Sequence, residues 1–286
     1  MCPKRSLTEF DIAAEKGVVN VLRAEGVAFR NELRYRLERP ALYQVETPFL
    51  LHNAVDAAIR RLEDKGIIVT TDLRGRKRKT TGRKPLLFYR LSSTSYTRQI
   101  QDTIKIKRDC STFVLGLSSY AGFYAQKLWV KAFRELDFNI LGEEMDEFDG
   151  NASSVEGDID IIVEKDGVVF GVEVKNGLSY PTNIRRKFRI AAELKTIPFF
   201  VARALSWGDR KWLPANGGLM KLYDVSIFSP DCPRKVQECI RILGVPIFVT
   251  EKIDRHVVEH LDRVVGIGFS KLGEYKEKIK RYLKSK

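Results

Sequence analysis

The sequence predicts an α/β protein built from two domains. Three helical patterns followed by two short strand patterns fill the first 92 residues. Farther along, two segments that are apolar at every residue each follow a helix, at Ile197–Val201 and Val245–Val249. Strands without a polar face are covered on both sides, so we expect a mixed central sheet between helical layers. We therefore expect domains at residues 1–92 and 113–286, joined by a polar linker at 93–112.

The composition is that of a folded, reduced protein. The 286 residues are 44% hydrophobic and 30% charged, as in globular chains. No run approaches the roughly 20 apolar residues of a membrane helix, and no signal-peptide pattern is present, so we expect a cytoplasmic protein without a membrane partner. Four cysteines without paired spacing indicate neither a disulfide framework nor a zinc knuckle.

Positive charge is concentrated at the start of the chain. The net charge is +13, and residues 1–110 hold 23 Lys and Arg against 13 Asp and Glu, whereas residues 111–286 hold 27 against 24. A basic domain attracts polyanions, and no lipidation signal or amphipathic anchor favours a membrane. The expected partner is nucleic acid.

The first domain is predicted as three helices followed by a hairpin. Apolar residues at helical spacing mark the helices, and β-branched and aromatic residues mark the strands. The predicted helices are Ser6–Arg23, Phe29–Leu37 and Thr47–Lys65, and the predicted strands are Ile67–Thr71 and Leu86–Leu91. The loop between the strands, Arg74–Lys84, holds seven cations in eleven positions.

This order over residues 6–92 resembles the winged-helix DNA-binding domain. The resemblance implies that the third helix enters the major groove and that the basic loop, the wing, contacts phosphate. The expected phosphate contacts are Arg74, Arg76, Lys77, Arg78, Lys79, Arg83 and Lys84. On the third helix, Asn53 and Arg60 either read bases or face solvent; the alternative for the loop is a solvated hairpin tip.

The second domain is predicted from a succession of helices and strands with two further helices at its end. The predicted helices are Ser119–Leu136, Asn183–Leu194 and Pro233–Leu243. The predicted strands are Phe138–Leu141, Ile197–Val201 and Val245–Thr250, with a hairpin at Asp158–Lys175.

The hairpin gathers charged side chains on one face. Asp166-Gly167 is a strong two-residue turn signal. A turn there pairs Lys165 with Val168, and therefore sets Asp160 opposite Glu173 and Asp158 opposite Lys175. Ile159, Ile161, Val172 and Val174 then fill the other face. Two close carboxylates repel each other unless a cation lies between them, and a hard divalent ion is the natural occupant.

Asp160 with Glu173-Val174-Lys175, preceded by Gly157-Asp158-Ile159-Asp160, resembles the motif of the PD-(D/E)xK nucleases. That superfamily includes restriction endonucleases and Holliday-junction resolvases, and the resemblance covers roughly residues 119–205. It implies a restriction-endonuclease-like fold in which Asp160, Glu173 and the Val174 carbonyl hold Mg²⁺, for which Mn²⁺ can substitute. It also implies that Lys175 acts on the attacking water. The alternative is a solvated hairpin with an Asp158–Lys175 cross-strand pair.

Two further features bear on the site. Many superfamily members carry a Glu on the helix before the first strand, where this sequence has Gln126; the outer ligand is then Gln126, Asp158 or Glu144. The helix after the motif carries Arg185, Arg186, Lys187 and Arg189, which either position phosphate or form a solvated face.

Together these features predict a metal-dependent DNA endonuclease acting on duplex or branched DNA. One site per chain favours a homodimer for cutting both strands. Two alternatives remain: an inactive nuclease fold that binds or regulates DNA, or a nuclease subunit of a transposase or helicase complex. No ATPase P-loop is present, so a motor or recombination partner would be a separate chain.

Overall fold

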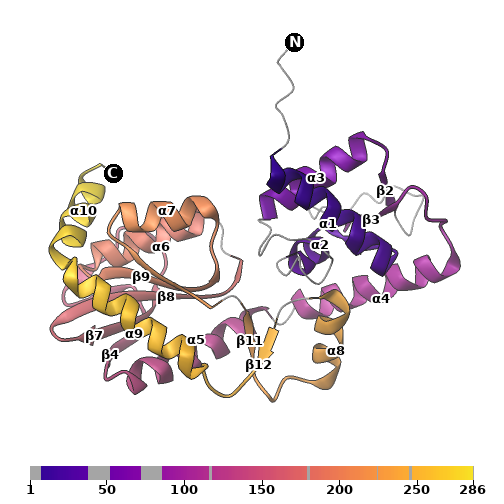
Figure 1. Cartoon of the computed structure of the whole chain (residues 1–286). Coiled ribbons are helices and arrows are strands. Elements are labelled where there is room, and N and C mark those ends of the chain that lie inside the picture. The colour runs from indigo at the N-terminus through magenta and orange to yellow at the C-terminus, as the bar shows by residue number, and fades with distance from the viewer. Residues whose placement is uncertain are drawn as a thin grey trace, which may run out of the picture. The chain divides into compact units, whose positions relative to one another are not determined.

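The chain folds into two compact units, which we describe separately (Figure 1). The computed structural model describes residues 8–37, 52–71, 86–115, 118–178, 181–223, 225–244 and 247–285. Unit 1 comprises residues 1–116 and 233–246, and unit 2 comprises residues 117–232 and 247–286. Among the described residues, no helix has the length and apolar character needed to cross a membrane.

Unit 1 begins with three helices and a small antiparallel sheet, as the sequence predicts. The elements are α1 (Glu9–Glu25), β1 (Ala28–Phe29), α2 (Arg30–Arg36), α3 (His52–Asp64), β2 (Ile68–Thr71) and β3 (Phe88–Leu91). The strand order is β1-β3-β2. Thr8 caps α1 by accepting a hydrogen bond from the amide of Asp11, whose carboxylate accepts one from Thr8 in return. The sequence missed β1, because two residues are too few to show a period.

The core of this part lies between the three helices and the sheet. Val18 and Leu22 of α1 are buried in one cluster with Leu33 of α2 and with Val55 and Ile59 of α3. These residues recur at helical spacing, so each helix buries one apolar stripe. The wing residues 74–84 lie outside the described residues.

The predicted linker is wrong over most of its length. Helix α4 spans Arg98–Leu115, and Ile100, Ile104 and Lys107 are buried on one side of it. Lys107 donates hydrogen bonds to Val27 O (2.7 Å) and to Glu32 Oε1 (2.6 Å) inside unit 1. A lysine interrupts the apolar stripe, which hid the helical period from a prediction based on hydrophobicity.

Helix α8 (Arg234–Leu243) also differs from the predicted domain organisation. The sequence placed it in one continuous second domain over 113–286, but residues 233–246 group with unit 1. Cys239 and Leu243 of α8 share a buried cluster with Ile104 and Cys110 of α4. The chain thus returns to unit 1 for one helix between two strands of unit 2.

Unit 2 contains a mixed sheet of five strands, as predicted. Its elements are α5 (Ser118–Glu135), β4 (Asn139–Met145), β5 (Glu147–Phe148), β6 (Asn151–Ala152), β7 (Ile159–Lys165), β8 (Val168–Leu178), α6 (Pro181–Glu193), β9 (Ile197–Ala204), α7 (Trp207–Ala215), β10 (Leu219–Leu222), β11 (Ser226–Phe228), β12 (Ile247–Val249), α9 (Arg255–Ser270) and α10 (Leu272–Lys284). The order is β10-β9-β8-β7-β4. β8, β9 and β10 are parallel, whereas β7 is antiparallel to both β8 and β4.

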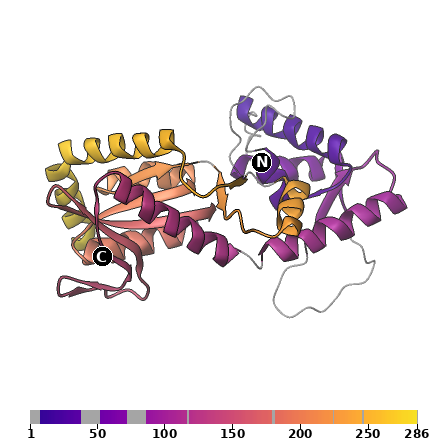
Figure 2. The same cartoon turned by 90° about the horizontal axis from the view of Figure 1, so that it is seen from below.

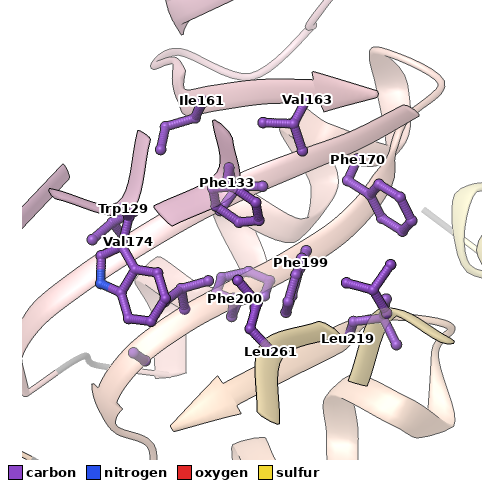
Figure 3. Packing of buried hydrophobic residues seen from close by; sticks show 14 of the residues in the cluster. Trp129, Phe133, Ile161, Val163, Phe170, Val174, Phe199, Phe200, Leu219 and Leu261 are labelled. Carbon is purple, nitrogen blue, oxygen red and sulfur yellow. The ribbon is translucent and has the colours of Figure 1, made fainter. Parts of the chain in front are cut away.

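Two helices cover the opposite faces of this sheet, and Figure 2 shows α5 running beside the strands. Trp129 and Phe133 of α5 pack in one cluster with Val172 and Phe199 (Figure 3). On the other face, α6 approaches β8 so closely that a Cβ at Gly171 would meet Ala191 at 2.9 Å. Every residue of β9 is buried, as its apolar pattern predicts. The other apolar segment, predicted at Val245–Thr250, lies outside the central sheet, because β12 pairs with β11 instead.

Candidate active site

The β7–β8 hairpin has the predicted register. Lys165 pairs with Val168, and the pairing continues to Ile161 and Val172. Asp166 and Gly167 have φ values of 53° and 75°, the left-handed conformations that a tight two-residue hairpin turn requires. The turn therefore fixes which side chains share a face. The pairing ends at Ile161 and Val172, and Asp160 and Glu173 are the next residue of each strand.

A side chain takes the place of a backbone partner at that position. Asp160 Oδ2 accepts a hydrogen bond from the Val174 amide at 2.7 Å. Within a strand, the N–H and C=O of one residue point toward the same neighbouring strand, so the Val174 carbonyl lies on the β7 side of β8. Ile159 departs from the prediction, because it packs with Ile162 and Ile190 on the α6 side of the sheet rather than with Ile161. At Ile159 the strand β7 is no longer paired with β8.

Glu173 is the most buried acid of the hairpin. Its side chain is 1% exposed, so water does not solvate the carboxylate. It lies instead against two ammonium groups, with Lys187 Nζ 3.2 Å from Oε2 and Lys175 Nζ in close contact with Oε1. Burial, and then the nearby charge of Asp160, raise the pKa of Glu173 to about 7.

Lys187 corrects the sequence prediction for α6. It was expected to be an exposed phosphate contact, but it is buried and points into the carboxylate group. Its Nζ lies 2.8 Å from Asp158 Oδ1, donates to Asp158 O at 2.7 Å and lies 3.9 Å from Asp160 Oδ1. Burial lowers the pKa of Lys187, but the charge of Glu173 and the hydrogen bond to Asp158 outweigh it and raise the pKa overall. The missed signal was spacing: Lys187 follows Ile184 by three residues and precedes Ala191 by four, and both are buried.

Lys175 faces the carboxylates as expected but does not pair with Asp158. Its Nζ contacts Glu173 and lies 3.9 Å from Asp160 Oδ2. Asp158 pairs with Lys187, and the hydrogen bond from Lys187 lowers the pKa of Asp158. The alternative of a solvated hairpin with an Asp158–Lys175 pair is therefore wrong.

The three candidates for an outer ligand occupy different positions. Gln126 is buried on α5, and its amide nitrogen donates to the backbone oxygen of Asp160 at 2.9 Å. The Asp158 side chain is 46% exposed beside the carboxylates. Glu144 is exposed on β4, where its neighbours Glu143 and Met145 pair with Ile161 and Ile159, so it comes opposite Asp160; its φ of 55° interrupts the regular strand.

The remaining cations of α6 divide into two kinds. Arg185 and Arg186 are exposed, and the Arg185 guanidinium lies over the Trp212 ring at 5.5 Å. Arg189 is held by Glu193 at 2.7 Å and by the Ser154 hydroxyl at 3.0 Å, so it fastens the loop before β7 to the helix. Only the first two retain the geometry expected of phosphate contacts.

In unit 1, the described part of the predicted DNA surface is exposed. Asn53 and Arg60 lie seven residues apart on α3, and both side chains reach solvent. The wing cations Arg74, Arg76, Lys77, Arg78, Lys79, Arg83 and Lys84 fall on residues that the structure does not describe.

The donor set at the hairpin fits a hard divalent cation. Asp160 and Glu173 supply carboxylate oxygens, which are ligands that Mg²⁺ prefers, and the Val174 amide donates to Asp160 beside them. The two Glu173 oxygens contact Lys175 Nζ and Lys187 Nζ, so a metal ion bound here would compete with these ammonium groups for the carboxylate. No group of three or more His, Cys, Asp or Glu suited to a metal occurs among the described residues.

Comparison with known proteins adds no relative to this picture. No family model matches the chain, and no curated protein matches it. The interpretation of the site therefore depends on the geometry of its residues.

Proposed function

We propose that this protein is a metal-dependent DNA endonuclease. The observation that carries the proposal is the convergence of Asp160, Glu173 and Lys175 at one end of a buried hairpin, with Lys187 from α6 completing the group. Two adjacent carboxylates, one of them buried with a raised pKa, are a costly arrangement for a structural role. Such unfavourable burial of charged groups is typical of functional sites.

The arrangement of elements supports the same proposal. A helix, an antiparallel hairpin, a second helix and a parallel strand follow one another in unit 2, the order expected for the core of PD-(D/E)xK nucleases. In unit 1, the order of three helices with β2 and β3 is the one expected of a winged helix. These likenesses of topology favour DNA as the substrate.

Each residue of the site has a chemical task in phosphodiester hydrolysis. A bound Mg²⁺, or Mn²⁺ in its place, would supply positive charge to the phosphate and lower the pKa of a water molecule. Asp160 and Glu173 would hold that ion, and the amide of Val174 fixes the Asp160 carboxylate. Lys175 stabilises the negative charge that develops on the phosphate oxygens, and Lys187 orients Asp158 and Glu173.

The two units would divide the work. Unit 1 binds DNA through α3 and the wing, and unit 2 cuts it. Because the described residues of one chain form one such site, a double-strand break would need a homodimer, or a recombination or ATPase partner that presents a second site.

The test is incubation of the purified protein with supercoiled plasmid, a labelled four-way junction and single-stranded DNA, each with Mg²⁺, Mn²⁺ or chelator. We expect cleavage of at least one DNA with metal and none with chelator. The matched control is Lys175→Ala, which keeps both carboxylates. No cleavage of any of these DNAs by the wild type, or equal cleavage by the variant, would contradict the proposal.

A second candidate is a DNA-binding regulator with an inactive nuclease fold. Lys175 and Lys187 already neutralise much of the carboxylate charge, which favours a site that is stable without metal. This candidate predicts binding of the same DNAs with no metal-dependent product.

A further inference from the structure

We propose that the outer face of α5 binds single-stranded DNA. We call this face the α5 stripe and define it as Tyr120, Phe123, Lys127, Lys131 and Arg134. The inference builds on the proposed function, since it names the substrate class as DNA with an unpaired segment, such as a flap or a branch.

The α5 stripe is a single, narrow helix face. Its members follow one another at spacings of three or four residues, which aligns them along one side of a helix. All five side chains are exposed, and the two aromatic rings are 46% (Tyr120) and 49% (Phe123) exposed. The opposite side of α5 is committed to the core through Trp129 and Phe133. The side chains of the α5 stripe therefore take no part in the hydrophobic core of unit 2.

Its chemistry is complementary to a single nucleic-acid strand. Aromatic rings stack on the faces of unpaired bases, which a duplex conceals, and cations contact the phosphates beside them. Lys127 Nζ lies 4.4 Å from the centre of the Phe123 ring, so charge and ring form one contact surface. Helix α5 carries three cations and one acid, Glu135, which is the last residue of the helix, so its net charge is positive.

The same helix is fastened to the candidate active site. Gln126 of α5 donates to the backbone of Asp160, and the Ala121 carbonyl accepts a hydrogen bond from Asn176, the residue after Lys175. A DNA strand bound along the α5 stripe would therefore be bound by a helix that is hydrogen-bonded to β7 and to β8.

The test measures binding with chelator present, so that cleavage plays no part. The probes are a fluorescein-labelled 15-nucleotide thymidine strand and a 15-base-pair duplex, followed by anisotropy over a range of salt. We expect the double variant Tyr120→Ala with Phe123→Ala to weaken binding of the single strand about tenfold or more, with little effect on the duplex. We expect Lys127→Glu, Lys131→Glu and Arg134→Glu together to flatten the salt slope for the single strand by about two units.

Matched controls come from α9, from α10 and from Lys271 between them, all in the same unit. Arg263→Glu, Lys271→Glu and Lys276→Glu change the charge by the same amount, and Ile267→Ala removes another exposed apolar side chain (54% exposed). We expect all four substitutions to leave single-strand binding within about twofold. Thermal unfolding monitors whether each variant is folded.

Contact at the rings is tested directly by photo-crosslinking a thymidine strand that carries 5-iododeoxyuridine. We expect crosslinks at Tyr120 or Phe123, located by mass spectrometry. Crosslinks only elsewhere, equal losses for the stripe and control variants, or equal losses for single strand and duplex would each overturn the inference. A wild type that binds as expected but cuts nothing with Mg²⁺ would contradict the proposed nuclease function and leave this inference standing.

Discussion

At the scale of single residues, the hairpin makes the sharpest prediction. Asp160→Ala and Glu173→Ala should each lower metal-dependent cleavage at least about a hundredfold, because each removes a proposed ligand. Lys175→Ala should lower cleavage similarly without weakening Mn²⁺ binding, measured by titration calorimetry, since it keeps both carboxylates and removes an ammonium group that competes with the ion for Glu173. Lys276→Ala, an exposed lysine on α10, is the control. Wild-type rates in all three hairpin variants would place the chemistry elsewhere.

The raised pKa of Glu173 predicts a stability effect that is independent of catalysis. A folded pKa of about 7 against an ordinary 4.5 means that the folded protein binds the proton more tightly than the unfolded chain. That contribution is complete below pH ~4.5 and is lost as the pH rises through 7, a change of about 3 kcal/mol. With chelator present, Glu173→Gln should therefore gain stability relative to the wild type between pH 5 and pH 8. Denaturant unfolding at both pH values measures this, and a constant difference contradicts it.

Gln126 makes a third prediction, because its amide donates to the Asp160 carbonyl. An ionised Glu cannot donate, so Gln126→Glu should destabilise the fold by about 1–3 kcal/mol in the absence of metal. If position 126 is an outer ligand, Mn²⁺ should recover part of that loss. Thermal unfolding with and without Mn²⁺ measures both effects. Full stability without metal would show that the hydrogen bond contributes little.

The parts of the site that the sequence predicts are those whose positions are set by residues close to them in the chain. The turn at Asp166-Gly167 sets the register of the hairpin, so Asp160 and Glu173 could be opposed from the sequence alone. Lys187 comes from a helix on the far side of a crossover, and which of its faces meets the sheet is a matter of tertiary packing. The four cations among residues 185–189 of α6 suggested a solvated surface and hid Lys187, which is buried.

At the scale of elements, α4 shows how a buried charge conceals a helix. Lys107→Ala would leave Glu32, which is fully buried, without one of its two basic neighbours. Breaking a buried pair costs about 3–5 kcal/mol, so the unfolding midpoint of unit 1 should fall markedly. Lys105→Ala on the same helix, where the side chain is 60% exposed, should change stability by less than about 0.5 kcal/mol. Equal effects of the two variants would mean that the network does not hold α4.

The strands that sequence reasoning placed correctly are those whose pattern has one explanation. β9 is apolar over its first five residues, Ile197–Val201, and lies between β10 and β8 inside the sheet, where all of its residues are buried. The segment that became β12 has the same pattern but pairs with β11, since an apolar run indicates burial without specifying a partner. The sequence therefore predicted which segments form strands, but it did not predict which strand each distant segment pairs with.

At the scale of the whole molecule, the course of the chain decides how the two units can be separated. A fragment over residues 111–286 would carry α8 without most of α4, exposing the apolar surface of Cys239 and Leu243. Tests of DNA binding by unit 1 are therefore better made with substitutions in the full chain than with truncations.

The wing gives the prediction at this scale. Each phosphate neutralised on duplex DNA releases counterions and contributes about 0.9 to the logarithmic salt slope. Replacing Arg76, Lys77, Arg78 and Lys79 with Ser should therefore flatten the slope for duplex binding by about two to four units, while Arg263→Ser, Lys271→Ser, Lys276→Ser and Lys284→Ser together should change it by less than one. Anisotropy with a labelled duplex and chelator provides the measurement. An unchanged slope in the wing variant would show that this loop does not contact DNA, and unit 1 would lose its proposed role in binding the duplex.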